Sequence, residues 1–250
     1  MNEMLTAEQW QAYEEQGYLR LGRVLSDTEL SALQNRIDDI MLGRAELDYD
    51  QLMMQREADS ESAQTAQTLG FKGATLNYRK IQNLELDPLF LNYMSKPLFR
   101  SICGAVYGDR QVASFRAMFM NKPAYHGTVL PYHQDRWTHL DRDPLVTVWT
   151  ALDPATEANG CVKIFPGTHK TLMNPSNPSG FLTESQQESL MAEQKPELLV
   201  LEPGEAVLLH NWTVHGSDGN ATSLSRRAFS VCYMDADTVS AKNESIFRLF

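Results

Sequence analysis

The chain has 250 residues, of which 42% are hydrophobic, and a formal net charge of −10 at pH 7. This length suits one large domain, and the negative charge argues against partners such as nucleic acid or an anionic membrane surface. The three cysteines (Cys103, Cys161 and Cys232) are widely spaced, so we expect no disulfide framework and a reducing, cytoplasmic location. We expect neither a signal peptide nor a membrane helix, because no suitable apolar run is present.

The first ninety residues are expected to be mainly helical. Residues 6–9 (TAEQ) and 26–29 (SDTE) fit the capping-box pattern that begins helices. After the second box, apolar residues recur at helical spacing as far as Gly43, which can end the helix. Residues 18–21, between the two predicted helices, favour a short strand.

Residues 44–74 have a different character from the helices before them. They are polar, acidic and weakly periodic, which predicts a long loop with some helix. Loops of this length inside a domain are usually lids or disordered segments. Two interpretations therefore remain open, a lid over a functional site and a solvated surface insertion.

The second half of the chain has the rhythm of a β-protein. One or two further helices are expected in residues 87–107, and one more at 183–193. Short apolar or alternating runs separated by turn residues predict strands at 111–120, 145–152, 161–165, 198–201, 206–209 and 228–233. This spacing is typical of an all-β sandwich or barrel. We predict a single domain over residues 1–250, with helical support in 1–108 and a β core in 109–250.

Candidate metal ligands stand at His133, Asp135 and His215. An extended backbone sends residues i and i+2 to the same side, so His133 and Asp135 can reach one point. His215 can complete the set from another strand. Two imidazoles and a carboxylate on one face of an octahedron form the site of non-haem Fe(II) oxygenases. An H-x-D triplet alone is common by chance, so this interpretation needs support from elsewhere in the chain.

Arg226 supplies part of that support. It lies eleven residues after His215 and begins an alternating, strand-like segment. An arginine returned to the metal by the next strand can hold a carboxylate bidentately. A 2-oxo acid that chelates iron at one end needs such an anchor at the other. Arg227 would point to the opposite side and is expected to be solvated.

Four blocks of sequence together carry a family resemblance. They are residues 79–83 (RKIQN), 118–135 (from MFMNKP to HQD), 148–170 (from VWTALD through NGC to PGTHK) and 203–226 (from PGE through HGS to Arg226). In this order and spacing the chain resembles the phytanoyl-CoA dioxygenase family of Fe(II)/2-oxoglutarate oxygenases. The resemblance implies a double-stranded β-helix, a cupin-like jelly-roll of two sheets buttressed by N-terminal helices.

The resemblance also implies roles for individual residues. His133, Asp135 and His215 match the iron ligands, and Arg226 matches the anchor for the distal carboxylate of 2-oxoglutarate. Other matched positions line the cosubstrate in relatives: Lys80, Trp149, Ser217 and Met118. The implied reaction is hydroxylation or a related oxidation of a C–H bond by O2, with 2-oxoglutarate converted to succinate and CO2. Relatives that halogenate carry Gly or Ala in place of the carboxylate, so Asp135 favours hydroxylation.

Several residues beside the metal triplet are candidates for substrate contact. His126 and His139 flank it, and Arg136 and Trp137 follow Asp135 directly. Arg136 can pair with an anionic substrate group, or equally with a neighbouring aspartate on the surface. The apolar residues 246–250 are expected to pack on the sheet or against a second subunit, so the chain is predicted to be a monomer or a homodimer.

Two other classes of function compete with a hydroxylase. A catalytically silent jelly-roll that binds a ligand would have no need of His133, Asp135, His215 and Arg226 together. A metal-dependent hydrolase, or a cupin-type dioxygenase without 2-oxoglutarate, would need no dicarboxylate anchor such as Arg226 or Lys80. The family oxidises acyl-CoA thioesters, compatible-solute amino acids, phosphonates and secondary metabolites. The acidic composition and small size favour a free small metabolite over a carrier-bound one.

Overall fold

The structure is a computed structural model that describes residues 4–58, 66–242 and 246–250. Its helices are α1 (Ala7–Gln16), α2 (Asp27–Met41), α3 (Pro88–Met94), α4 (Pro97–Tyr107) and α5 (Glu184–Glu193), with short 3-10 turns η1 (Tyr49–Gln51), η2 (Leu84–Leu86), η3 (Glu157–Asn159) and η4 (Thr168–Lys170). Its strands are β1 (Tyr18–Arg23), β2 (Met53–Arg56), β3 (Thr68–Leu69), β4 (Tyr78–Gln82), β5 (Val112–Lys122), β6 (Leu130–His133), β7 (Val146–Ala151), β8 (Val162–Phe165), β9 (Glu197–Leu199), β10 (Glu205–His210), β11 (Val214–Ser217), β12 (Arg226–Asp235) and β13 (Phe247–Arg248).

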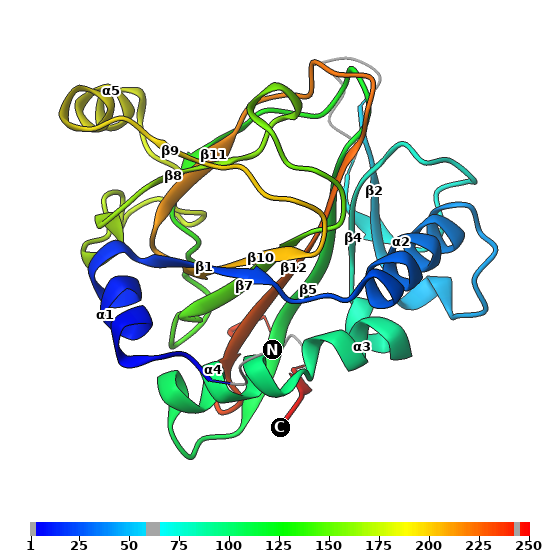
Figure 1. Cartoon of the computed structure of the whole chain (residues 1–250), viewed down its shortest axis with the longest axis horizontal. Coiled ribbons are helices and arrows are strands. Elements are labelled where there is room, and N and C mark those ends of the chain that lie inside the picture. The colour runs from blue at the N-terminus through cyan, green and yellow to red at the C-terminus, as the bar shows by residue number, and fades with distance from the viewer. Residues whose placement is uncertain (1–3, 59–65, 243–245) are drawn as a thin grey trace.

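Two antiparallel sheets form the body of the molecule (Figure 1). Within the described residues the larger sheet has nine strands, in the order β1-β10-β7-β12-β5-β4-β2-β3, with β13 also paired to β5. The smaller sheet has the order β6-β11-β8-β9. The predicted mainly-β jelly-roll, with helices supplied by the N-terminal part, is confirmed.

The outer face of the larger sheet packs against α2, α3 and α4. Phe229 on β12 and Phe119 on β5 are fully buried there, together with Phe90 and Phe99 from the helices. The rings of Phe90 and Phe229 meet edge to face, with centroids 4.8 Å apart. Burial of each such side chain contributes about 1.5–3 kcal/mol. This core fixes the larger sheet against its helical support.

A second core lies between the two sheets. Trp149 on β7 and Val207 on β10 meet Ile164 on β8 and Leu199 on β9 there. Because both faces of β7 are covered, all six of its residues are buried, including Thr147 and Thr150.

The N-terminal part confirms some predictions and corrects others. Both capping boxes form: the side chain of Thr6 accepts from the amide of Gln9 at the start of α1, and that of Ser26 from Glu29 at the start of α2. The predicted strand at 18–21 is β1. However, the first ninety residues also supply β2, β3 and β4, which extend the larger sheet beyond β5. Sheet pairing overrides local propensity here.

The segment 44–74 is more regular than the sequence predicts. Besides loop and the short helical turn η1, its described residues form the strands β2 and β3, which the sequence did not predict. Residues 59–65 lie outside the described residues, so the lid and the surface insertion both remain predictions. Near the C-terminus, residues 247–248 pair as β13 with β5 of the same chain. This segment therefore packs on the sheet, which is one of the two predicted alternatives. In the described part of the chain, no helix has the length and apolarity needed to cross a membrane.

The prediction that Arg227 is solvated is wrong. Its side chain points away from that of Arg226, as strand alternation requires, but it is not solvated and is only 18% exposed. Its Nε and Nη2 donate to the two carboxylate oxygens of Asp153, each at 2.8 Å, and its Nη1 donates to Asp38 at 2.6 Å. These bonds connect β12 to the turn after β7 and to α2.

We predict that Arg227→Ala lowers the free energy of unfolding by about 2–4 kcal/mol, because it leaves the mostly buried carboxylate of Asp153 without its partner. The matched control is Arg44→Ala. Arg44 pairs with Asp39 at 3.1 Å, but its side chain is 61% exposed, so its loss should cost less than about 1 kcal/mol. Chemical denaturation of both variants measures the difference, and equal costs would contradict the structural role of Arg227.

Candidate metal centre

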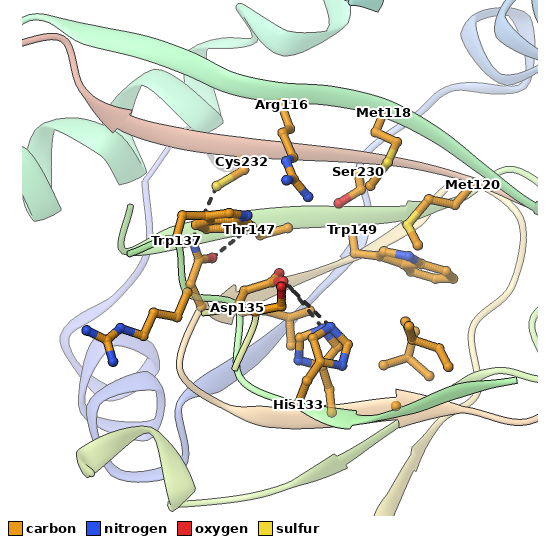
Figure 2. A pocket seen from close by; sticks show the side chains of 18 of the residues that line it. Arg116, Met118, Met120, His133, Asp135, Trp137, Thr147, Trp149, Ser230 and Cys232 are labelled. Carbon is orange, nitrogen blue, oxygen red and sulfur yellow. Dashed lines mark hydrogen bonds and ion pairs between the residues drawn. The ribbon is translucent and has the colours of Figure 1, made fainter. Parts of the chain in front are cut away.

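The three predicted metal ligands converge at one end of the smaller sheet. His133 ends β6, Asp135 follows it, and His215 on β11 lies directly opposite His133 in the strand register. His133 Nε2 is 3.6 Å from Asp135 Oδ1, and His215 Nε2 is 3.9 Å from Asp135 Oδ2. Figure 2 shows His133 and Asp135 turned toward one another. One ligand atom from each residue lies within 4.8 Å of the others, a spacing suited to a single metal ion.

Both imidazoles are held in the tautomer that a metal requires. Nδ1 of His133 is 2.9 Å from the carbonyl oxygen of Pro131, and Nδ1 of His215 is 2.9 Å from that of Thr213. A carbonyl oxygen can only accept, so each Nδ1 carries the hydrogen. Each Nε2 then presents its lone pair toward Asp135. A second hydrogen bond of this kind is usual for metal-binding histidines and sets the ring orientation.

The electrostatics of the group also suit a cation. Burial, together with the neighbouring His133, lowers the pKa of His215 to about 4, so this imidazole is neutral near pH 7. Burial by itself would raise the pKa of Asp135, but interaction with the adjacent His133 and His215, together with the charge of Arg116, holds it well below its ordinary value. Asp135 is therefore ionised. Imidazole nitrogen together with one carboxylate is a ligand set that Fe(II) binds in non-haem oxygenases.

Gln134, between the two ligands, is a residue whose role the sequence did not indicate. It is almost fully buried. Its side-chain nitrogen donates to the carbonyls of Trp212 at 2.7 Å and Thr171 at 2.8 Å, and its side-chain oxygen accepts from the amide of Met173 at 2.8 Å. Gln134 thus connects the ligand-bearing turn to the loops on both sides, which fixes the positions of its two neighbours.

A cavity of about 370 Å³ opens beside the three ligands. The predicted cosubstrate residues all line it: Lys80, Met118, Trp149, Ser217 and Arg226. Three of the predicted substrate contacts, Arg136, Trp137 and His139, line it as well. His126 does not, since it lies exposed in the turn after β5.

Arg226 and its neighbours fit a bound carboxylate. Arg226 is 2% exposed, and its guanidinium carbon lies 5.4 Å from the centroid of the Trp149 ring. Its Nε and Nη1, and Nε1 of Trp149, are buried without a hydrogen-bond partner among the described residues. Burial lowers the pKa of Arg226 to about 10. A buried cation with unsatisfied donors is costly unless an anion joins it.

Arg116 is a further residue of the cavity that the sequence did not single out. Arg116, Met118 and Met120 alternate along β5 and all line the cavity, and Figure 2 shows the three on one side of that strand. The i, i+2 spacing from Met118 is the signal that would have found Arg116. The alternative prediction for Arg136 is met in part, because its Nε lies 4.0 Å from Asp143.

Comparison with known proteins agrees with this geometry. Residues 13–228 match the family model of phytanoyl-CoA dioxygenase (PhyH). The chain is 28% identical to a probable phytanoyl-CoA dioxygenase of Caenorhabditis elegans, covering 94% of this chain and 77% of the other. It is 27% identical to the peroxisomal phytanoyl-CoA dioxygenase of Homo sapiens, with coverages of 94% and 70%.

Among solved structures, EctD from S. alaskensis with 2-oxoglutarate and 5-hydroxyectoine superposes with a TM-score of 0.75 at 20% identity, covering 93% of this chain and 77% of EctD. The carbocyclase SnoK from nogalamycin biosynthesis gives a TM-score of 0.70 at 20% identity, with coverages of 94% and 86%. These two likenesses concern the fold. The family match spans most of the chain, and the chain therefore belongs to the phytanoyl-CoA dioxygenase family of 2-oxoglutarate-dependent non-haem iron oxygenases.

Proposed function

We propose that the protein uses Fe(II), 2-oxoglutarate and O2 to hydroxylate, or otherwise oxidise, a C–H bond of a small metabolite. The observation that carries this proposal is the shared cavity. The ligand atoms of His133, Asp135 and His215 and the unsatisfied guanidinium of Arg226 line the same space. A metal site and a buried carboxylate anchor in one cavity are what a chelating 2-oxo acid requires.

In this proposal the chain's residues divide into two groups. Nε2 of His133, Nε2 of His215 and the carboxylate of Asp135 hold Fe(II), which leaves coordination positions open. Arg226 holds the distal carboxylate of 2-oxoglutarate, and Lys80 adds a second positive charge. When bound, the iron and cosubstrate activate O2 for attack on a C–H bond, and 2-oxoglutarate leaves as succinate and CO2.

The remaining lining residues position the cosubstrate and exclude water. Met118 and Trp149 supply apolar walls, and Ser217 supplies a hydroxyl on β11, two residues after His215. Nε1 of Trp149 is a donor still without a partner among the described residues. A water-poor cavity strengthens each charge–charge contact within it and protects reactive species from side reactions.

The alternative of a silent jelly-roll receives no support. A protein that only binds a ligand would gain nothing from two histidines held in the metal-binding tautomer beside an ionised carboxylate. A hydrolase without 2-oxoglutarate would gain nothing from the buried cation Arg226, which carries a desolvation cost.

The proposal extends to the whole chain. Lys80 comes from the N-terminal part and the metal ligands from the C-terminal part, yet they line one cavity, which supports a single working domain. The three cysteines are free and buried, which is compatible with the predicted cytoplasmic location. A monomer or a homodimer remains the prediction for assembly.

We predict that the purified protein binds one Fe(II) per chain and that His133→Ala or Asp135→Ala abolishes both iron binding and turnover, because each removes one of three ligands. Metal analysis after desalting and succinate formation are the two measurements. His126→Ala is the matched control, since His126 lies outside the cavity, and it should retain iron. Full turnover by His133→Ala without added imidazole would contradict the assignment.

Arg226→Ala should raise the apparent constant for 2-oxoglutarate by about 10- to 100-fold, as expected for loss of a charged, bidentate hydrogen bond. Anaerobic calorimetry of the iron-loaded protein measures the affinity directly. Arg227→Ala should leave that affinity unchanged despite its lower stability, because its side chain lies on the other face of β12. A reversed pattern would mean that the two arginines have exchanged faces.

The affinity for 2-oxoglutarate should also depend on pH through Lys80. Burial, and then the charges of Arg79 and Arg116, lower the pKa of Lys80 to about 8. The free protein therefore carries this charge below about pH 8 and loses it above. We predict that binding weakens as pH rises from 8 to about 9.5, and that Lys80→Arg, which stays charged, flattens the dependence. Equal pH profiles for the two proteins would rule out a contact with Lys80.

A further inference from the structure

One cation in the cavity has no assigned partner. Arg116 lies on β5, two residues before Met118, and Figure 2 shows its side chain reaching from that strand into the space above Asp135 and beside Trp137. Within residues 4–58, 66–242 and 246–250, the guanidinium of Arg116 makes no hydrogen bond and no ion pair. Its contacts there are with aromatic rings.

Those rings hold the guanidinium in place. Its carbon lies 4.8 Å from the ring centroid of Trp137 and 5.2 Å from that of Phe115. The two rings themselves meet edge to face at 4.6 Å. Cation–π contacts of this kind hold a guanidinium without using its N–H groups as hydrogen-bond donors, so those groups stay available. Arg116 is therefore pre-organised to bind a planar anion.

The charges that line the cavity also favour an anionic ligand. Its described lining includes five cationic side chains, Lys80, Arg116, Arg136, Arg226 and Lys242, and one acidic side chain, the metal ligand Asp135. This holds although the whole chain has a net charge of −10.

The other cations are already engaged or lie at the edge. The proposed function assigns Lys80 and Arg226 to the cosubstrate. Arg136 donates to the carbonyl of Pro175 and faces Asp143, and Lys242 is exposed.

We propose that Arg116 binds a carboxylate of the primary substrate, so that the enzyme oxidises small organic acids. This inference rests on the proposed function. A cavity of about 370 Å³ is near the lower end of the range for ligand sites, roughly 300–1,000 Å³, and it must also admit 2-oxoglutarate. A single free guanidinium neutralises one carboxylate, whereas a phosphonate dianion would keep an unbalanced charge.

The test begins with matched compounds. Straight-chain carboxylic acids of about three to eight carbons, sized to the cavity, are compared with their primary amides and with phosphonates of the same chain length. The measurement is stimulation of succinate formation by the iron-loaded enzyme, followed by anaerobic calorimetry of the acids that stimulate. Acids should bind at least about tenfold more tightly than their amides, because the amide loses the charge-assisted bond.

Variants then locate the effect. Arg116→Met should weaken binding of the acid by about 10- to 100-fold, leave binding of the amide unchanged, and leave the affinity for 2-oxoglutarate unchanged. Arg116→Lys keeps the charge but loses the planar fork, so it should fall between the two. Arg100→Met is the matched control. Arg100 also stacks on an aromatic ring, that of Phe250 at 5.3 Å, but it lies on α4 outside the cavity.

Four outcomes would overturn the inference. They are binding of amides as tight as that of acids, a preference for phosphonates, no saturable binding by any acid, and an equal loss of 2-oxoglutarate and acid affinity in Arg116→Met. If Arg116→Met fails to fold, as thermal unfolding would reveal, Arg116→Lys decides the matter. Iron and 2-oxoglutarate binding by the unaltered protein are measured separately, so this inference can fail while the proposed function stands.

Discussion

The antiparallel register between β6 and β11 is the constraint on which the site depends. It sets His215 opposite His133, and the extended turn after His133 returns Asp135 to the same point. A slip of one residue in this pairing would send one imidazole to the opposite face of the sheet. The three side-chain bonds of Gln134, to Thr171, Met173 and Trp212, oppose such a slip, because any shift would break several hydrogen bonds at once.

The two faces of the larger sheet have different roles. One packs against the helices, and the other lines the cavity. On β12, Arg226 points between the sheets toward the cavity, and Arg227 points outward to carboxylates of α2 and of the turn after β7. The same division holds on β5, where Phe119 enters the helical core while Met118 and Arg116 line the cavity. The helices stabilise one face of the sheet, and the other face lines a cavity that contains the unpartnered guanidinium donors of Arg226. Such a hollow would be destabilising without that support.

The charge of the cavity is opposite in sign to the net charge of the chain. The whole chain has a net charge of −10, but the described lining of the cavity holds five cationic side chains and one carboxylate. Two of these cations, Arg116 and Arg226, lie against tryptophan rings, and Arg226 has two buried donors without a partner among the described residues. Their desolvation is a cost of folding that bound anions can offset. This arrangement gives the cavity a preference for negatively charged ligands before any metal is considered.

The sequence by itself determined what local spacing can encode. The i, i+2 pair His133 and Asp135, the opposed faces of Arg226 and Arg227, and both capping boxes follow from strand and helix periodicity. Only the tertiary structure decided what depends on distant partners. Arg227 is mostly covered because α2 brings Asp38, 189 residues away in sequence, against the outer face of β12. Arg116 is held in the cavity by its contact with Trp137, which lies on a separate loop. No local sequence pattern predicts these two contacts, because they depend on the order of the strands and on the packing of distant segments.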